Sequence, residues 1–112
     1  MKVLIADDIM ENQYLLKAML TGNGHEVTTA VYVLSCLESA LANPPDLIIS
    51  DILMPVMDGF QLCKECKGDD ILKKVPFVFY TATYTDKEDE EFALSLGADR
   101  FLTKPMEPDR FM

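Results

Sequence analysis

Three aspartates and one lysine stand at the ends of short apolar runs in this chain of 112 residues. Asp7 and Asp8 follow the first run, Asp51 follows the third, and Lys104 follows the last. If these runs are parallel strands, their carboxyl ends meet at one edge of a sheet and bring the acids and the cation into one crevice. Magnesium is usually held by one or two carboxylates together with phosphate oxygens. The pattern therefore favours a site for a divalent metal and a phosphoryl group, as in a phospho-acceptor switch.

Each of these residues also has a simpler structural explanation, and only their joint occurrence argues against it. Asp8 before a first helix is a typical cap, but capping does not account for Asp51 after an apolar strand. Three close carboxylates repel one another unless they serve a cation. A carboxylate can attack phosphorus when cations neutralise the transferring group, and Lys104 supplies such a cation. Thr81, an ordinary β-branched strand residue by itself, offers a hydroxyl that could hydrogen-bond the phosphoryl oxygens.

The elements that must position these groups alternate along the chain as strand and helix. The apolar runs are short and rich in Val, Ile and Phe, and longer segments with helical spacing separate them. Runs that are nearly continuous in apolar residues are expected where helices cover both faces of a parallel sheet. The predicted strands are Lys2–Ala6, Val27–Ala30, Leu47–Ser50, Phe77–Thr81 and Arg100–Leu102. The fold class is therefore α/β, a doubly wound five-stranded parallel sheet.

Helical periodicity predicts which faces of the helices are buried. The first helix is expected over Glu11–Leu20 and the second over Val33–Ala42, while a third begins at Phe60. A capping box of Thr85 and Glu88 is expected to start the fourth. The residues expected to face the core are Leu15, Leu16, Met19 and Leu20 in the first helix, Leu34, Leu37 and Leu41 in the second, and Phe92 and Leu96 in the fourth.

Composition places the chain among acidic single domains. With 49% hydrophobic residues, residues 1–112 fit one compact domain. The formal net charge of −9 disfavours direct binding to nucleic acid or to an anionic membrane. No apolar stretch approaches the roughly 20 residues that span a bilayer, and the start does not read as a signal peptide. We therefore expect a soluble, cytoplasmic protein.

Three cysteines, Cys36, Cys63 and Cys66, make an odd count that fits a reducing compartment. Cys63 and Cys66 form a C-x-x-C spacing, for which metal binding or redox chemistry stays an alternative. No second pair completes a zinc site, however, and a redox motif is expected after the first strand. We interpret all three as packing residues.

Two segments leave room for contacts with other chains. Val31-Tyr32-Val33 is apolar where a polar loop is usual, which indicates either local packing, the favoured reading, or a partner surface. Only seven residues follow Pro105, so a truncated final helix is expected. Either the chain was cut from a longer protein, which we favour, or a stub leaves apolar sheet surface that pairs with another chain. A homodimer stays open.

Four motifs, in order, resemble one known family over essentially the whole chain. They are Ala6-Asp7-Asp8, Asp51 followed by Ile-Leu-Met-Pro-Val-Met-Asp-Gly, Tyr80-Thr81-Ala82, and Phe101-Leu102-Thr103-Lys104-Pro105. Together they resemble the receiver domain of two-component response regulators. The resemblance implies the flavodoxin-like strand order 2-1-3-4-5, which is known from a chemotaxis member of that family. It also implies a signalling domain that assists its own phosphorylation and dephosphorylation and is not an enzyme.

The same resemblance implies the acceptor and the metal ligands. The domain would take a phosphoryl group onto Asp51 from the phosphohistidine of a histidine kinase or a histidine phosphotransfer protein. Asp8, Asp51 and the backbone carbonyl of Leu53 would hold Mg²⁺, and Asp7 would bind it directly or through water. An output partner would read the change, and the sequence does not identify it.

The resemblance also implies a switch. Lys104 would pair with the phosphoryl group, Thr81 would move toward it, and Phe101 would turn inward to fill the space that Thr81 leaves. Leu53 and Thr83 occupy positions that influence how water attacks the phosphoryl group, and Leu53 has no polar side chain to orient that water. We therefore predict slow self-dephosphorylation.

Two alternatives stay in view. A magnesium-dependent phosphatase with an aspartyl-phosphate intermediate commonly shows Asp-x-Asp at the nucleophile, whereas Asp51 is followed by Ile52 and Leu53. The other alternative is a receiver-like interaction module that is not phosphorylated. Nucleotide binding is disfavoured because no Gly-rich loop follows the first strand.

Overall fold

The computed structural model describes residues 2–7, 10–30, 33–52, 59–81 and 86–103. They form a five-stranded, all-parallel sheet in the order β2-β1-β3-β4-β5, which confirms the predicted fold class and strand order. The strands are β1 (Lys2–Ala6), β2 (Glu26–Ala30), β3 (Leu47–Ser50), β4 (Phe77–Thr81) and β5 (Arg100–Thr103). The expected truncated final helix and the Val31-Tyr32-Val33 contact surface involve residues outside these ranges.

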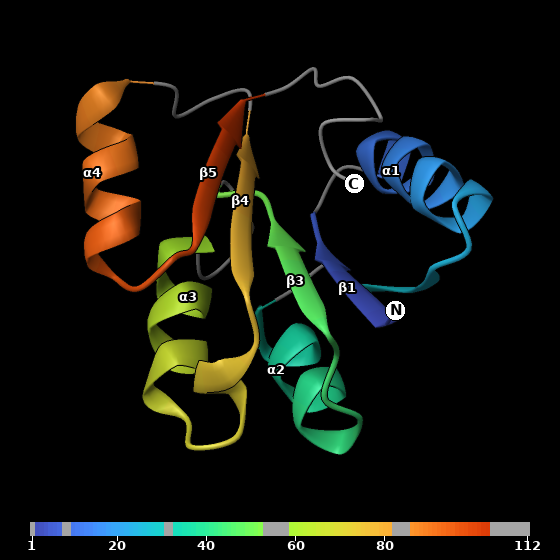
Figure 1. Ribbon diagram of the computed structural model, residues 1–112, viewed down its shortest axis with the longest axis horizontal. Coiled ribbons are helices and arrows are strands. Elements are labelled where there is room, and N and C mark those ends of the chain that lie inside the picture. The colour runs from blue at the N-terminus through green and yellow to red at the C-terminus, as the bar shows by residue number, and fades with distance from the viewer. Residues whose placement is uncertain (1, 8–9, 31–32, 53–58, 82–85, 104–112) are drawn as a thin grey trace.

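Helices cover both faces of this sheet (Figure 1). They are α1 (Met10–Gly22), α2 (Val33–Ala42), α3 (Gly59–Gly68) and α4 (Lys87–Ser95), with a short 3-10 helix at Leu72–Lys74. One core cluster joins α1 to the sheet through Leu16, Leu20 and Ile5. The larger cluster joins α2, α3 and α4 to the opposite face. No helix of the described residues is long and apolar enough to cross a membrane.

The central strands are buried on both faces, as their continuous apolar runs predict. Val3, Leu4 and Ile5 are each at most 2% exposed. Val3 and Ile5 pack in the cluster under α1, while Leu4 belongs to the cluster on the other face. This alternation follows from the two-residue period of a strand.

Several helix faces differ from the prediction. Leu15 of α1, Leu41 of α2 and Phe92 of α4 are 66%, 47% and 51% exposed, so the expectation that they face the core was wrong. In α2 and α4 small side chains, Cys36, Ala40 and Ala93, lie against the core instead. Because small residues let helices pack closely, the larger neighbours are left on the flanks.

Two further differences from the prediction concern the buried face of α1 and the start of α4. In α1, Gln13 joins Leu16 and Leu20 on the buried face. The capping box of α4 consists of Asp86 and Asp89, with the Asp86 N–H donating to Asp89 Oδ2 at 3.3 Å. The predicted box was therefore displaced by one residue.

The cysteines are packing residues, as interpreted from sequence. Cys36, Cys63 and Cys66 are free thiols in the larger core cluster, each at most 1% exposed. Burial raises the pKa of the Cys36 and Cys66 thiols to about 12 and that of Cys63 to about 11. Thiols of this kind are poor nucleophiles and poor metal ligands, because both roles need the thiolate.

Candidate functional site

Two of the predicted acids lie on neighbouring strand ends at the carboxyl edge of the sheet. β1 and β3 pair in parallel with Ala6 opposite Ser50. Asp7 and Asp51 are the next residues of each chain segment, and the Asp51 N–H donates to the Ala6 carbonyl at 2.8 Å. Both aspartates are buried, at 4% and 6% exposed. Acidic side chains are seldom this buried, so the two adjacent strand ends are a candidate functional site.

Backbone and side-chain hydrogen bonds fix the orientation of Asp51. The Ile52 N–H donates to Asp51 Oδ1 at 2.7 Å, which sets the plane of the carboxylate. The hydroxyl of Ser50, itself fully buried, donates to the Asp51 carbonyl at 2.7 Å. The acid is thus held by its own strand end.

The start of α3 packs directly onto the backbone of Asp51. Gly59 donates its N–H to the Ile52 carbonyl at 2.6 Å. A Cβ at Gly59 would overlap the Asp51 carbonyl oxygen and lie 2.9 Å from Ile52 Cα. Glycine is needed here for close backbone approach, and this contact holds the strand end that carries Asp51.

Asp7 is held from the side of α1 and β2. Its N–H donates to the Ala30 carbonyl at 3.1 Å, at the end of the neighbouring strand. The buried side chain of Gln13 donates through Nε2 to the Asp7 carbonyl and, at 3.2 Å, to the Ala30 carbonyl. Three elements therefore meet at Asp7.

The predicted switch residues lie on the same face of neighbouring strands. Thr81 is fully buried and pairs in register with Thr103, while Phe101 pairs with Phe79. Phe101 is partly buried, with its ring 6.3 Å from that of Phe79. Thr81 and Phe101 are thus two positions apart on adjoining strands.

Aromatic rings connect β4 and the start of α3 to the surface of α4. Phe60, the residue after Gly59, contacts Phe79 edge-on with ring centroids 5.5 Å apart. It also contacts the half-exposed Phe92 of α4 at 4.9 Å. A rigid apolar contact therefore joins the start of α3 to α4.

The remaining predicted site residues, Asp8, Leu53 and Lys104, lie outside the described residues. Within the described ranges no group of three or more His, Cys, Asp or Glu residues could hold a metal ion. The two acids that are described fit a hard cation in donor type, since both offer carboxylate oxygens at one buried edge.

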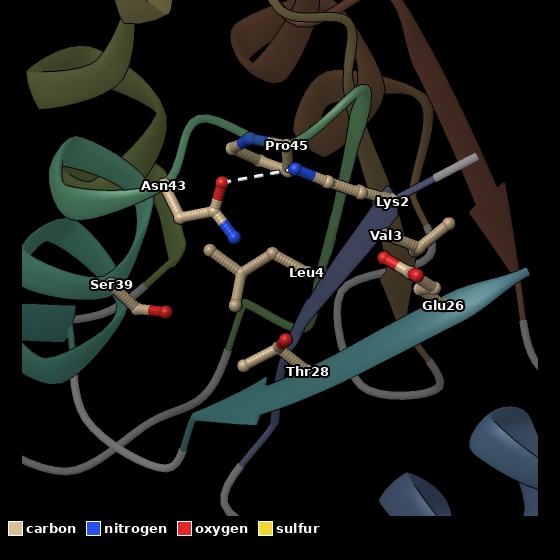
Figure 2. A pocket seen from close by; sticks show the side chains of 8 residues that line it. All are labelled: Lys2, Val3, Leu4, Glu26, Thr28, Ser39, Asn43 and Pro45. Atoms are coloured by element: carbon tan, nitrogen blue, oxygen red, sulfur yellow. Dashed lines mark hydrogen bonds between the residues drawn. The ribbon is translucent and has the colours of Figure 1, made fainter.

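The opposite, amino edge of the sheet has different chemistry. Lys2 donates its backbone N–H to Asp46 Oδ2 at 2.7 Å and its Nζ to Asn43 Oδ1 at 3.1 Å. Figure 2 shows the latter bond beside a small pocket lined also by Thr28 and Ser39. Its volume of about 50 Å³ is room for one or two waters. We assign this edge a structural role.

A second group of hydrogen bonds at that edge joins α3 to the segments where β4 and β5 begin. Lys67 Nζ donates to Asp99 Oδ2 at 3.1 Å and to the Val75 carbonyl at 3.0 Å. The same Asp99 oxygen accepts the Phe77 N–H at 2.8 Å. Burial raises the pKa of Asp99, but the bonds from Phe77 and Lys67 and the charge of Lys67 outweigh it and leave that pKa below its usual value.

Sequence reasoning missed the residues that hold the acids. Gly59 has a signal in retrospect, since a glycine follows the turn-forming loop and opens a helix. Gln13 carries no such signal, because a glutamine inside a helix usually lies on the solvent face.

The model of the response regulator receiver domain family matches residues 3–112. Response regulator PleD of Caulobacter vibrioides is 40% identical over 106 residues, which are 95% of this chain and 23% of PleD. This chain thus spans about a quarter of that curated relative.

Solved structures agree with the family match. A response regulator from Chloroflexus aurantiacus superposes with a TM-score of 0.91 at 33% identity, covering 97% of this chain and 88% of that one. The receiver domain of sensor histidine kinase PA1611 from Pseudomonas aeruginosa has a TM-score of 0.88 at 28% identity, covering 98% and 89%. In that structure a magnesium ion is coordinated in the active site cleft.

The fold, the acid pair and these matches define a signalling domain of the two-component class. The chain belongs to the response regulator receiver domain family. Its role is the phosphoryl-accepting signalling role of that family, and the phosphatase alternative is not favoured.

Proposed function

We propose that Asp51 is the residue of this receiver domain that accepts the phosphoryl group. The observation that carries the proposal is the buried pairing of Asp51 with Asp7 at adjacent strand ends, joined through the 2.8 Å bond from Asp51 N–H to Ala6. No other acid of the described residues combines such burial with the end of a central strand. The donor is the phosphohistidine of a histidine kinase or of a histidine phosphotransfer protein.

Phosphoryl transfer requires from the protein mainly that it position the reacting groups and stabilise their charge. The Asp51 carboxylate attacks phosphorus, the bond from phosphorus to the donor histidine breaks, and an acyl phosphate results. The bond from Ile52 N–H to Asp51 Oδ1 keeps the carboxylate plane fixed before the attack. Lys104 is the cation proposed to pair with the phosphoryl oxygens.

The metal proposed for this site is Mg²⁺. Asp7, Asp8, Asp51 and the Leu53 carbonyl would hold it. When bound, the metal would neutralise the charge of the transferring group. Support comes from the carboxylate oxygens of Asp7 and Asp51, which suit a hard cation and would repel each other without one.

The proposed switch uses Thr81 and Phe101. A phosphoryl group adds about 1.5 to 2 negative charges and three acceptor oxygens, which the buried Thr81 hydroxyl can recruit by moving toward Asp51. Phe101 then turns into the space on the same sheet face. Their placement on adjoining strands supports this coupling.

We propose that residues 1–112 act as one domain in the cytoplasm, without direct binding to nucleic acid or membrane. Histidine kinases and output domains are the partners with which response regulators act. The net charge of −9 supports a protein partner over nucleic acid.

The test is phosphorylation by a small-molecule phosphodonor with Mg²⁺, followed by intact mass. The expected result is a gain of one phosphoryl group that is absent without Mg²⁺ and absent in Asp51→Asn. No gain with any donor would favour the non-phosphorylated interaction module. Sustained turnover of phosphate esters would favour the phosphatase.

The phosphorylated form is predicted to lose its phosphoryl group slowly. Leu53 offers no polar side chain to orient an attacking water, and Thr83 occupies the second position that influences this attack. The intact-mass assay, repeated after removal of the donor, measures the decay. A half-life on the seconds scale with Mg²⁺ present would contradict the prediction, and Leu53→Asn is expected to speed the decay.

A further inference from the structure

Gln13 is a buried polar residue whose position the phosphoryl-accepting role does not by itself explain. It lies near the start of α1 and is 7% exposed. Glutamine is mostly exposed in proteins, and a buried amide is costly unless its donors are bonded. Here both partners of Nε2 are backbone carbonyls at strand ends, those of Asp7 and Ala30.

These bonds close a small network around Asp7. The Ala30 carbonyl accepts both the Asp7 N–H at 3.1 Å and Gln13 Nε2 at 3.2 Å. Gln13 also bonds the Asp7 carbonyl, which belongs to the peptide group that joins Asp7 to Asp8. One side chain therefore holds the carbonyl groups of Asp7 and Ala30 together at the ends of β1 and β2.

We propose that Gln13 is a positioning residue that presets the acids of the Mg²⁺ site before the metal binds. The inference rests on the proposed function of Asp51 and its neighbours. The amide of Gln13 supplies two N–H donors from one uncharged nitrogen to two carbonyls, whereas Glu has acceptors and Met has no donor. Groups that orient metal ligands typically change metal affinity by 10–100-fold when they are mutated.

The experiment compares two variants that each remove donors to buried or partly buried backbone carbonyls. Gln13→Met keeps the length of the side chain and removes its bonds at the carboxyl edge. Lys67→Met removes the bonds to Val75 and Asp99 at the amino edge and is the matched control. The Mg²⁺ dissociation constant of the full chain without phosphodonor is measured by titration calorimetry, with the melting temperature recorded for each protein.

The expected result is about a tenfold weaker Mg²⁺ affinity for Gln13→Met and a change of less than about twofold for Lys67→Met. Equal affinities of Gln13→Met and the parent chain would overturn the inference. So would an equal loss in both variants, because this would indicate general destabilisation. A parent chain that binds no Mg²⁺ would overturn both this inference and the proposed metal site.

A measurement on the parent chain covers the case in which Gln13→Met fails to fold. In a nitrogen-15 NMR spectrum the side-chain amide of Gln13 gives its own signals, and addition of MgCl₂ is expected to shift them together with the backbone signal of Asp7. The side-chain amide of Asn43, at the opposite edge, should not move. Unshifted Gln13 signals at saturating Mg²⁺ would overturn the inference. If phosphorylation of Asp51 still proceeds in that case, the proposed function stands alone.

Discussion

The two edges of this sheet carry the same residue types and use them differently. At the amino edge the acids form hydrogen bonds with nearby residues: Asp46 accepts the backbone N–H of Lys2, and Asp99 binds Lys67 and Phe77. At the carboxyl edge Asp7 and Asp51 lie buried next to each other. Asp99 is half exposed and stabilises the fold through its pair with Lys67, whereas Asp7 and Asp51 are buried at adjacent strand ends.

The difference teaches where chemistry resides in a parallel sheet. Every strand ends at the same edge, so side chains just beyond the strand ends converge there. The residues before the strands converge equally at the other edge, but here they form ion pairs and turns. Convergence alone is therefore insufficient, and the burial of two aspartates at adjacent strand ends distinguishes the carboxyl edge.

Glycines at the two ends of α3 give the largest expected contrast between the edges. Gly59 lies against the backbone of Asp51, while Gly68 has open space around its Cα. Gly59→Ala should lower the free energy of unfolding by about 3 kcal/mol, because the new methyl group overlaps backbone that cannot yield easily. Gly68→Ala should change it by less than about 1 kcal/mol, in the stabilising direction. Urea denaturation of both variants measures the difference.

The Gly59→Ala variant also tests whether the contact between α3 and Asp51 affects phosphorylation. If the close approach of α3 positions Asp51, the phosphorylation rate of Gly59→Ala should fall even at temperatures where the variant is fully folded. A Gly59→Ala protein with parental stability and rate would show that the two backbones can separate without consequence.

Asp99 gives a smaller effect at the amino edge. Its pKa is lower in the folded protein than in the unfolded chain, because the bonds from Phe77 and Lys67 outweigh burial. The stabilisation is therefore fully present above the unfolded pKa of about 3.9 and is lost as pH falls through the folded pKa. Since the Asp99 side chain is 49% exposed, solvent screens the pair and Asp99→Asn should cost only about 0.5–1 kcal/mol at pH 7.

The pH dependence separates this explanation from simple packing. The stability difference between the parent chain and Asp99→Asn, measured by urea denaturation, should shrink as the pH falls below about 4. A difference that stays constant down to pH 2 would mean that the charge of Asp99 contributes nothing. Phosphorylation of Asp51 should be unaffected by this substitution.

The cysteines of the folded protein are expected not to react with an alkylating reagent. This expectation tests the claim that chemistry is confined to the carboxyl edge. With thiol pKa values of about 11 to 12, Cys36, Cys63 and Cys66 hold almost no thiolate at pH 7.5. Iodoacetamide should leave the folded protein unmodified and add three groups after denaturation, as read by intact mass. Rapid labelling of Cys63 or Cys66 in the folded protein would revive the redox interpretation of the C-x-x-C pair.

The sequence predicted the sheet and its edges well because strand periodicity and burial act over a few neighbouring residues. Runs such as Val3-Leu4-Ile5 can be stable only between two helical layers, and their ends fix where Asp7 and Asp51 lie. The helix faces were predicted less well. Leu15 and Leu41 fit an apolar stripe by spacing, yet the closest packing positions belong to Gln13 and to small residues.

The supporting contacts of the site could not be predicted, because they depend on how strand ends and helix starts come together in the fold. Gln13 bonds the ends of two strands, and Gly59 lies against the backbone of Asp51 and Ile52. A glycine that opens a helix is visible in the sequence, but the close backbone approach that requires it is not. The position of Asp7 and Asp51 at adjacent strand ends could be predicted, because each directly follows an apolar strand.

The central claim is that Asp51 at the carboxyl edge carries the phosphoryl group. Its most direct test is to treat the full chain with a phosphodonor and Mg²⁺, reduce the product with borohydride, which converts an aspartyl phosphate to homoserine, and locate the change by peptide mass spectrometry. The predicted result is homoserine at position 51 and none at Asp7, Asp46 or Asp99. Modification of another aspartate, with position 51 unchanged, would contradict the assignment.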